Sequence, residues 1–277
     1  MLALLLPVMW LADESGAQTP TTQQASSEQQ LINWYYGAVF GTGVYRAGDR
    51  TVSVLQIPFA HELQEPNDEQ WGVRVTAPIS FGFYDFTFNQ LVTGETPQSV
   101  GTISLFPGIE TQIPVISNWR LKPYANLGRG WDLSGGDAAW IYATGVRSLF
   151  AVPVGSDSEV SLGNQLTFAG YRPKGGPNAP MGVFVAGLNL ETPSGLQVQE
   201  RPALAGVHFM YYYYFKRLRF PTSSNLENTI SQQTEIAFSL SVKKPLDFEL
   251  FDLDRVGLAY RFGGGFRGVS LFFSLPY

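Results

Sequence analysis

The chain has 277 residues, and its 18 basic and 23 acidic residues give a formal net charge of −5 at pH 7. Charged residues make up 15% of the sequence, against about 25% in an ordinary soluble domain. The acidic balance argues against nucleic-acid binding, and the absence of cysteine excludes disulfides and thiolate metal sites.

The chain begins with an apolar run, Leu2 to Ala12, that is shorter than the 20 or so residues of a membrane-spanning helix. We interpret residues 1–17 as a secretory signal, with Ser15-Gly16-Ala17 as the small-residue cleavage site. The alternative is a hydrophobic segment of the core. Residues 18–31, rich in Thr, Gln and Ser, then form a polar leader or a segment that plugs the lumen. Residues 32–277 form a single β-barrel domain.

Segments in which large apolar residues occupy every second position follow from residue 32 onward. This period of two is typical of strands with two different faces, and about ten residues suffice for a tilted strand to cross a bilayer. The third segment is the clearest example, with an outer face of Trp71, Val73, Val75, Ala77, Ile79, Phe81 and Phe83. The first carries Trp34, Tyr36, Ala38 and Phe40. The ninth, Val207 to Phe220, is aromatic on both faces, so the sequence leaves its orientation open.

We count about twelve such segments, an even number as single-chain bacterial barrels require. The sequence therefore predicts an all-β, transmembrane, antiparallel up-and-down β-barrel. Pro58, Pro78 and Pro123 fall inside expected strands, where each removes a ladder donor, so they should lie near a rim or at bulges. The rival is a soluble antiparallel barrel or sandwich. We prefer the closed transmembrane barrel because an open sheet of this kind would leave an edge prone to aggregation.

With a periplasmic N-terminus, odd-numbered strands run outward. The expected extracellular loops are then Ala47–Asp49, Asp85–Gln98, Asp132–Asp137, Arg172–Asn178, Pro221–Gln233 and Gly263–Phe266. The expected periplasmic turns include Glu62–Gln70, Ser117–Asn118, Gly155–Ser158, Thr192–Pro202 and Lys243–Asp254.

Motifs that carry chemistry are few. Gly263 to Gly268 matches G-x-G-x-x-G, but a strand follows it where a dinucleotide site needs a helix, so we interpret it as a glycine-rich hairpin loop. His61 and His208 are the two histidines, and neither lies in a recognisable nucleophile motif. Asp252 and Asp254 lack calcium-loop spacing. We therefore expect no enzyme activity, no cofactor and no metal.

The run Tyr211 to Tyr214 predicts an aromatic girdle at the membrane interface or, alternatively, a platform on which sugars or bases stack. By alternation, the lumen should also receive charged side chains of both signs: Arg74, Arg120, Lys122, Arg147, Lys216, Arg261, Glu110, Glu191 and Glu235. These predict either an internal salt-bridge network or an anion-biased pore, since the sign of the lining charges sets selectivity.

The last residues alternate again, with Val269, Leu271, Phe273, Leu275 and Tyr277 on one face. This tail resembles the C-terminal signature strand of bacterial outer-membrane proteins. That resemblance implies that these five residues form a signal for the outer-membrane assembly machinery.

The stretches Trp119–Trp131 and Leu250–Phe262, together with the tail, resemble autotransporter β-barrels and, more narrowly, the solitary outer-membrane autotransporter-like barrel proteins. The resemblance implies a bacterial outer-membrane location and contact with outer-membrane lipid and lipopolysaccharide. Only about fourteen residues, 18–31, separate the expected cleavage site from the barrel, so we expect no secreted passenger.

The sequence leaves three functions open. The first is a structural barrel or a narrow, anion-leaning, porin-like pore for small anionic solutes. The second is an outer-membrane hydrolase that uses His61 or His208. The third is a surface adhesin that works through the loops Asp85–Gln98 and Pro221–Gln233.

Overall fold

A computed structural model describes residues 41–277, apart from 48–49, 68–69, 85–99, 134–135, 156, 177, 221–227, 249–250 and 276. The expected signal, the leader and the outer face Trp34–Phe40 of the first strand lie outside the described residues. The described part is all β: β1 (Thr42–Ala47), β2 (Arg50–Ile57), β3 (Ala60–Gln64), β4 (Gly72–Thr76), β5 (Ile79–Tyr84), β6 (Val100–Leu105), β7 (Gly108–Ile116), β8 (Trp119–Asp132), β9 (Ala138–Val154), β10 (Ser158–Pro173), β11 (Ala179–Val198), β12 (Arg201–Phe220), β13 (Asn228–Phe248), β14 (Phe251–Gly263) and β15 (Phe266–Phe272). In the same residues no helix has the length and hydropathy to cross a membrane.

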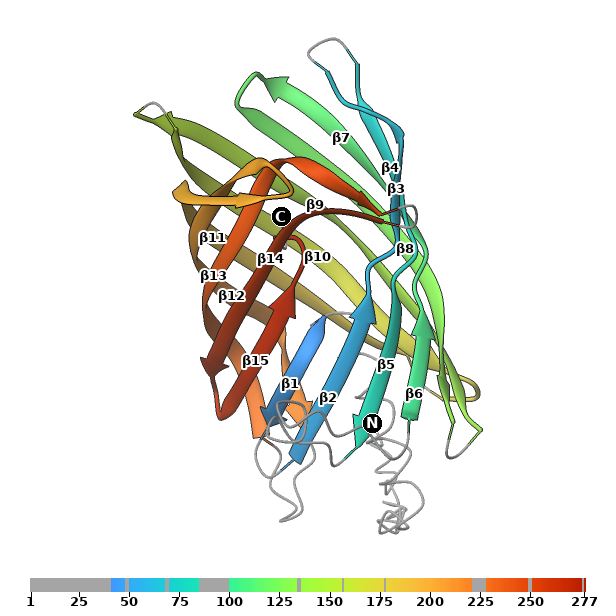
Figure 1. Ribbon diagram of the computed structural model, residues 1–277. Helices are drawn as coiled ribbons and strands as arrows, with labels where there is room; N and C mark the ends of the chain where they lie inside the picture. The colour runs from blue at the N-terminus through green and yellow to red at the C-terminus, as the bar shows by residue number, and fades with distance from the viewer. Residues whose placement is uncertain are drawn as a thin grey trace, which may run out of the picture.

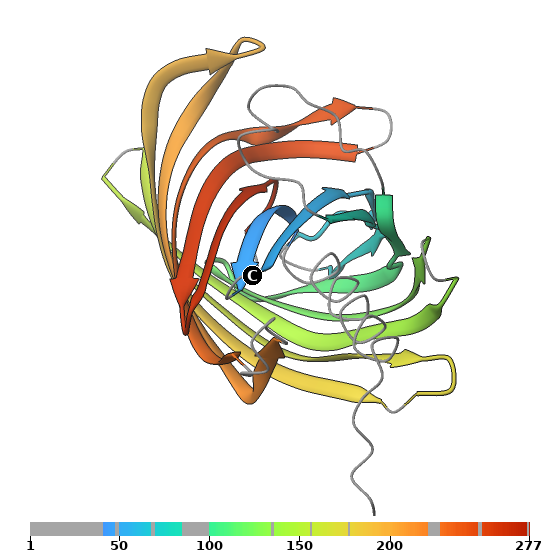
Figure 2. The ribbon, with the colours of Figure 1, turned by 90° about the horizontal axis from the view of Figure 1, so that it is seen from below.

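The strands close into a twelve-stranded antiparallel barrel (Figures 1 and 2), as the sequence predicts. From β8 to β15 each strand pairs with the next along the chain, and the ring closes where β1 pairs with β15, with Val44 opposite Val269. Three of the twelve are bent, because β2 continues into β3, β4 into β5 and β6 into β7.

The bends lie beside one another and each contains a proline: Pro58, Pro78 and Pro107. Ile57 pairs with Ile79, so Pro58 and Pro78 are opposite each other. Hydrogen bonds cross this row, from the Ala77 amide to the Phe59 carbonyl at 2.8 Å and from the Phe106 amide to the Pro78 carbonyl at 3.0 Å. We call it the proline row. Pro58 and Pro78 thus lie at bends between strand segments instead of at a rim. Pro123 stays inside β8 in regular register with Val146, so the prediction of a rim or bulge position is wrong for it.

The outer surface is apolar in registered rows. One row crosses five adjacent strands through Leu190, Val207, Phe238, Leu258 and Leu271, all of them exposed. A second row runs through Leu162, Leu188, Phe209, Ile236 and Tyr260. Phe238 is 62% exposed, whereas its neighbour Ala237 is 0% exposed and faces the lumen. The fold is thus apolar outside, the reverse of a soluble protein.

Several hairpins are tighter than the sequence predicts. β11 runs to Val198 and β12 starts at Arg201, so the expected turn Thr192–Pro202 shrinks to Gln199 and Glu200. β13 begins at Asn228, inside the expected loop Pro221–Gln233, and extends to Phe248. We call the end with the hairpins 132–138, 173–179 and 263–266 the loop end, and the opposite end, with Ser117–Asn118 and Gln199–Glu200, the turn end.

The C-terminal tail differs from the sequence expectation. β15 stops at Phe272, so the outward alternation of Val269 and Leu271 does not continue to Tyr277. Instead the chain bends at Phe273 and Ser274, and Tyr277 is 3% exposed inside the barrel (Figures 1 and 2). The five residues therefore do not form one continuous face.

Candidate functional site

The lumen is the candidate site, because the chain places its buried polar residues there. Between the two outer rows runs an inward row of Ser161, Asn189, His208, Ala237, Ala259 and Ser270, all of them buried. This alternation settles the orientation of β12: His208, Tyr212 and Tyr214 face the lumen, and Phe209 and Tyr213 face outward. The tyrosine run is therefore divided between the two faces.

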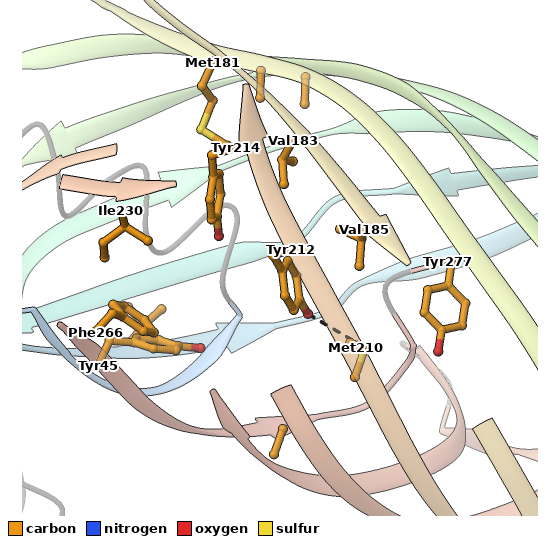
Figure 3. Close-up of a cluster of buried hydrophobic side chains, with 14 of the residues drawn as sticks. Tyr45, Met181, Val183, Val185, Met210, Tyr212, Tyr214, Ile230, Phe266 and Tyr277 are labelled. Atoms are coloured by element: carbon orange, nitrogen blue, oxygen red, sulfur yellow. Dashed lines mark hydrogen bonds between the residues drawn. The ribbon is translucent and has the colours of Figure 1, made fainter. Parts of the chain in front are cut away.

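A cluster of buried aromatic and apolar side chains lies inside the barrel (Figure 3). Figure 3 shows Tyr45 and Phe266 close together, and their rings stack with centroids 6.0 Å apart. Met181, Val183, Tyr214 and Ile230 lie in the same buried cluster. These six residues lie on β1, β11, β12, β13 and β15, and the same cluster extends to Tyr124 of β8 and Ile141 of β9, so buried side chains pack on more than one side of the lumen.

A buried ion pair lies next to that cluster. Arg261 Nε lies 2.6 Å from Glu235 Oε2, and the two side chains are 9% and 5% exposed. Arg261 Nη2 donates to the Tyr212 hydroxyl at 2.8 Å, and its guanidinium carbon lies 4.0 Å from the Tyr212 ring centroid. Tyr212 in turn donates to Glu235 Oε1 at 3.2 Å. Arg261 and Glu235 thus neutralise each other, and Tyr212 forms hydrogen bonds with both of them.

The opposite wall repeats the arrangement with other residues. Arg147 of β9 pairs with Glu110 of β7, and its guanidinium carbon lies 4.2 Å from the Tyr124 ring centroid. The Tyr124 hydroxyl lies 2.5 Å from Thr167 Oγ1 and accepts from Gln165 Nε2 at 2.9 Å. A glutamate, an arginine and a tyrosine thus hold together neighbouring strands on each side.

A third network surrounds the C-terminus. The Tyr277 hydroxyl donates to Asn189 Oδ1 at 2.5 Å, and Asn189 Nδ2 donates to Ser161 Oγ at 3.0 Å. Because the Asn189 amide nitrogen faces Ser161, its oxygen accepts from His208 Nδ1–H at 3.0 Å. His208 Nε2 is then unprotonated and accepts from the Ser239 hydroxyl at 2.7 Å.

The network continues to a further ion pair. Arg255 Nη1 donates to Ser239 Oγ at 3.1 Å and lies 2.5 Å from Glu191 Oε1. Glu191 Oε2 also accepts from Ser241 at 3.3 Å. His208 and Ser239 therefore lie in a continuous chain of hydrogen bonds from Tyr277 to Glu191.

The side chain of Lys216, one of the nine predicted lumen residues, is not among those that the structure describes. Six of the other eight form ion pairs: Arg147 with Glu110, Arg261 with Glu235, Glu191 with Arg255, and Arg74 with Glu62 at 3.3 Å. Sequence reasoning missed Arg255 and Glu62, although alternation along their strands also directs both inward. Arg120 and Lys122 share the inward face of Tyr124 on β8, and neither forms an ion pair with another described residue.

The other sequence motifs occupy positions with no evident chemical role. Gly263, Gly264 and Gly265 have positive φ values in the β14–β15 hairpin, as expected for a glycine-rich loop. His61 is exposed on β3. The described residues contain no group of three or more acidic or histidine side chains that would hold a metal ion. All of Asp85–Gln98, and residues 221–227 of the expected loop Pro221–Gln233, lie outside the described residues.

Comparison with known proteins gives one kind of match. The β-domain of the Bordetella autotransporter BrkA is a solved structure that superposes on 84% of this chain and 96% of its own, with a TM-score of 0.50 and 10% identity. At that identity the likeness concerns the fold alone. No family model matches the chain, and no curated protein matches its sequence. The chain thus has the fold of an autotransporter β-domain.

Proposed function

We propose that the protein is an integral barrel of the bacterial outer membrane in a Gram-negative cell. The registered apolar rows on five adjacent strands carry this proposal, because only an apolar solvent accommodates so many exposed large side chains. The buried polar row behind them meets the requirement that polar groups within the bilayer are satisfied by the protein. Fractionation of the tagged protein tests the location, and recovery as a soluble periplasmic protein would contradict it.

Within this barrel we propose a narrow, anion-leaning path along the wall formed by β4, β7, β8 and β9. On this wall Arg74, Arg120, Lys122 and Arg147 face Glu62 and Glu110, so basic groups outnumber acidic ones. Arg120 and Lys122, which form no ion pair with another described residue, lie two positions apart on the inward face of β8. A surplus of one sign along a pore wall favours the opposite ion.

Conductance of the refolded barrel in a planar bilayer, under a KCl gradient, tests the path. We expect steady openings that favour chloride, and reversed preference in Arg120→Glu with Lys122→Glu. Arg267→Glu is the matched control, because exposed Arg267 lies on the outward face of β15 and should leave the preference unchanged. A silent but folded barrel contradicts the path and leaves a purely structural barrel.

A second candidate function, ester hydrolysis, rests on the Ser239, His208 and Asn189 side chains of three adjacent strands. Serine, an unprotonated histidine nitrogen and an orienting amide are the parts of an activated nucleophile. Ser239 Oγ would attack an ester carbonyl while His208 Nε2 takes its proton. The alcohol would leave with that proton, and water would then release the acyl group. Arg255 beside Ser239 is placed to stabilise the oxyanion.

Both His208 and Ser239 are buried, so this activity requires displacement of the C-terminal residues around Tyr277. A fluorophosphonate probe applied to the folded barrel tests it. Labelling that disappears in Ser239→Ala and His208→Ala, and increases in Tyr277→Ala, supports hydrolysis. A barrel that stays unlabelled in every variant excludes it, and the hydrogen-bonded chain is then structural.

A further inference from the structure

Two arginines and two tryptophans come together on the outer surface of β8, β9 and β10. Trp140 of β9 is in register with Arg129 of β8 on one side and with Arg172 of β10 on the other. All three residues are exposed, while Ile141, the next residue of β9, is buried toward the lumen. Trp131 lies two positions beyond Arg129 on the same face. We call these four residues the Arg–Trp patch.

The tryptophans hold Arg129 in place. Its guanidinium carbon lies 5.8 Å from the Trp131 ring centroid and 5.9 Å from the Trp140 ring centroid, within the range of cation–π attraction. Arg172 is a direct cross-strand neighbour of Trp140, and such neighbours have Cβ atoms about 5 Å apart. The two arginines therefore lie on the strands on either side of the exposed Trp140.

The charge of the patch is not balanced by the described residues around it. Lys174, also exposed, adds a third cation just beyond Arg172. The acidic residues nearest along the chain are Asp137, which is exposed, and Asp132, which is buried. Neither Arg129 nor Arg172 forms an ion pair with a described residue. An anion from outside the protein would complete the patch.

The patch lies where the apolar surface ends. Along β10 the exposed residues Leu162, Leu166 and Phe168 are followed by Arg172, about 13 Å beyond Phe168 at the usual rise per residue. The patch is near the loop end, beside the hairpins 132–138 and 173–179. Tryptophan gathers at this depth in membrane proteins because its ring suits the boundary between acyl chains and headgroups.

We propose that the Arg–Trp patch binds the phosphate of a phosphorylated membrane-lipid headgroup, with Arg129 and Arg172 as its ligands. Guanidinium groups form paired hydrogen bonds with phosphate oxygens, and the indoles contact the apolar part of the same lipid. The exposed Trp140 and the half-buried Trp131 favour a lipid over free phosphate, because free phosphate offers the rings no apolar surface. The inference rests on the proposed membrane location.

Native mass spectrometry of the full barrel in detergent tests the proposal with lipid A, a phosphorylated acyl-glucosamine lipid, as the probe. We expect bound lipid A on the wild type, and about tenfold weaker binding in Arg129→Gln with Arg172→Gln. Dephosphorylated lipid A should bind the wild type as weakly as lipid A binds the double variant. Inorganic phosphate at millimolar concentration should not compete.

Arg267→Gln is the matched control, because Arg267 is an outward-facing arginine at the same end that pairs in register with Phe262 instead of a tryptophan. Its lipid binding should equal that of the wild type. Equal losses in the control and the double variant, or none in either, overturn the proposal. These outcomes are independent of cell fractionation, so a failure of the patch can be distinguished from a failure of the membrane location.

Discussion

The Tyr277 hydroxyl donates a hydrogen bond of 2.5 Å to the side-chain oxygen of Asn189, 88 positions earlier in the chain. The phenol ring lies against Gly163 and Gly187, which are paired across β10 and β11, and a Cβ atom at either position would collide with it. The C-terminal residue is therefore seated in a notch that the barrel wall leaves open for it.

Removal of the Tyr277 ring should destabilise the barrel more than removal of its hydroxyl. We expect Tyr277→Phe to cost about 1 kcal/mol for one hydrogen bond and Tyr277→Ala about 3–5 kcal/mol for the lost ring. Urea unfolding followed by tryptophan fluorescence measures both. Gly187→Ala should destabilise the wild type but not Tyr277→Ala, because the collision disappears with the ring. Additive effects would contradict the notch.

The stability of the barrel should fall strongly when either partner of the buried Arg261–Glu235 pair is removed. Its side chains are 9% and 5% exposed, so Glu235→Gln leaves a buried guanidinium unpaired and should cost about 3–5 kcal/mol. Arg261→Met with Glu235→Leu should recover part of that loss, because neither charge then remains. The Arg74–Glu62 pair is the comparison, since its side chains are 32% and 29% exposed and Glu62→Gln should cost at most about 1 kcal/mol. Equal costs at the two sites would be inconsistent with this account.

A charged residue on the outer surface should lower the stability of the barrel more when it lies deeper in the bilayer. Phe238, in the middle of β13, is 62% exposed, and Phe238→Arg should cost about 2–4 kcal/mol in lipid vesicles. Leu196 is 57% exposed near the turn end of β11, and Leu196→Arg should cost about 0–1 kcal/mol. Reversible unfolding from vesicles measures both. If neither change matters, the outer rows do not face lipid.

A substitution in the hairpin between β11 and β12 should increase the stability of the barrel. Gln199 and Glu200 have φ values of 47° and 63°, a conformation that costs ordinary residues energy and glycine little. We expect Glu200→Gly to stabilise the barrel by about 0.5–1 kcal/mol. Glu200→Pro should destabilise it, because the proline ring holds φ near −65°. Unfolding midpoints in urea distinguish the two variants, and a loss of stability in Glu200→Gly would contradict the turn geometry.

Alternation along the chain predicted most of the strand faces, because the outer surface and the lumen have opposite polarities. It left the orientation of β12 open, since both faces of that strand are aromatic, and it failed for the tail beyond Phe272. Trp71, Val75 and Phe83 stay on the same face of the sheet on both sides of the bend at Pro78. The sequence had predicted this segment as one uninterrupted strand. The turn Gln199–Glu200 was missed because neither residue is typical of a two-residue hairpin.

The contacts within the lumen depended on register, which alternation does not supply. Arg147 and Glu110 were both expected inside, but only the pairing of β7 and β9 with β8 brings them together. The path of Tyr277 was missed for a different reason. Its seat is built by glycines more than 80 positions away, and glycine leaves no signal in an apolar pattern.

The proline row has a consequence for how the barrel is assembled. A strand that slips by two residues along its neighbour keeps every side chain on the correct face, so polarity alone does not prevent that error. Pro58 and Pro78, opposite each other in adjacent strands, lack amide hydrogens at one fixed height of the wall. In the shifted register, each proline would lie opposite a backbone carbonyl that then has no N–H group to accept from. The two prolines therefore favour the observed register of these strands over a register shifted by two residues.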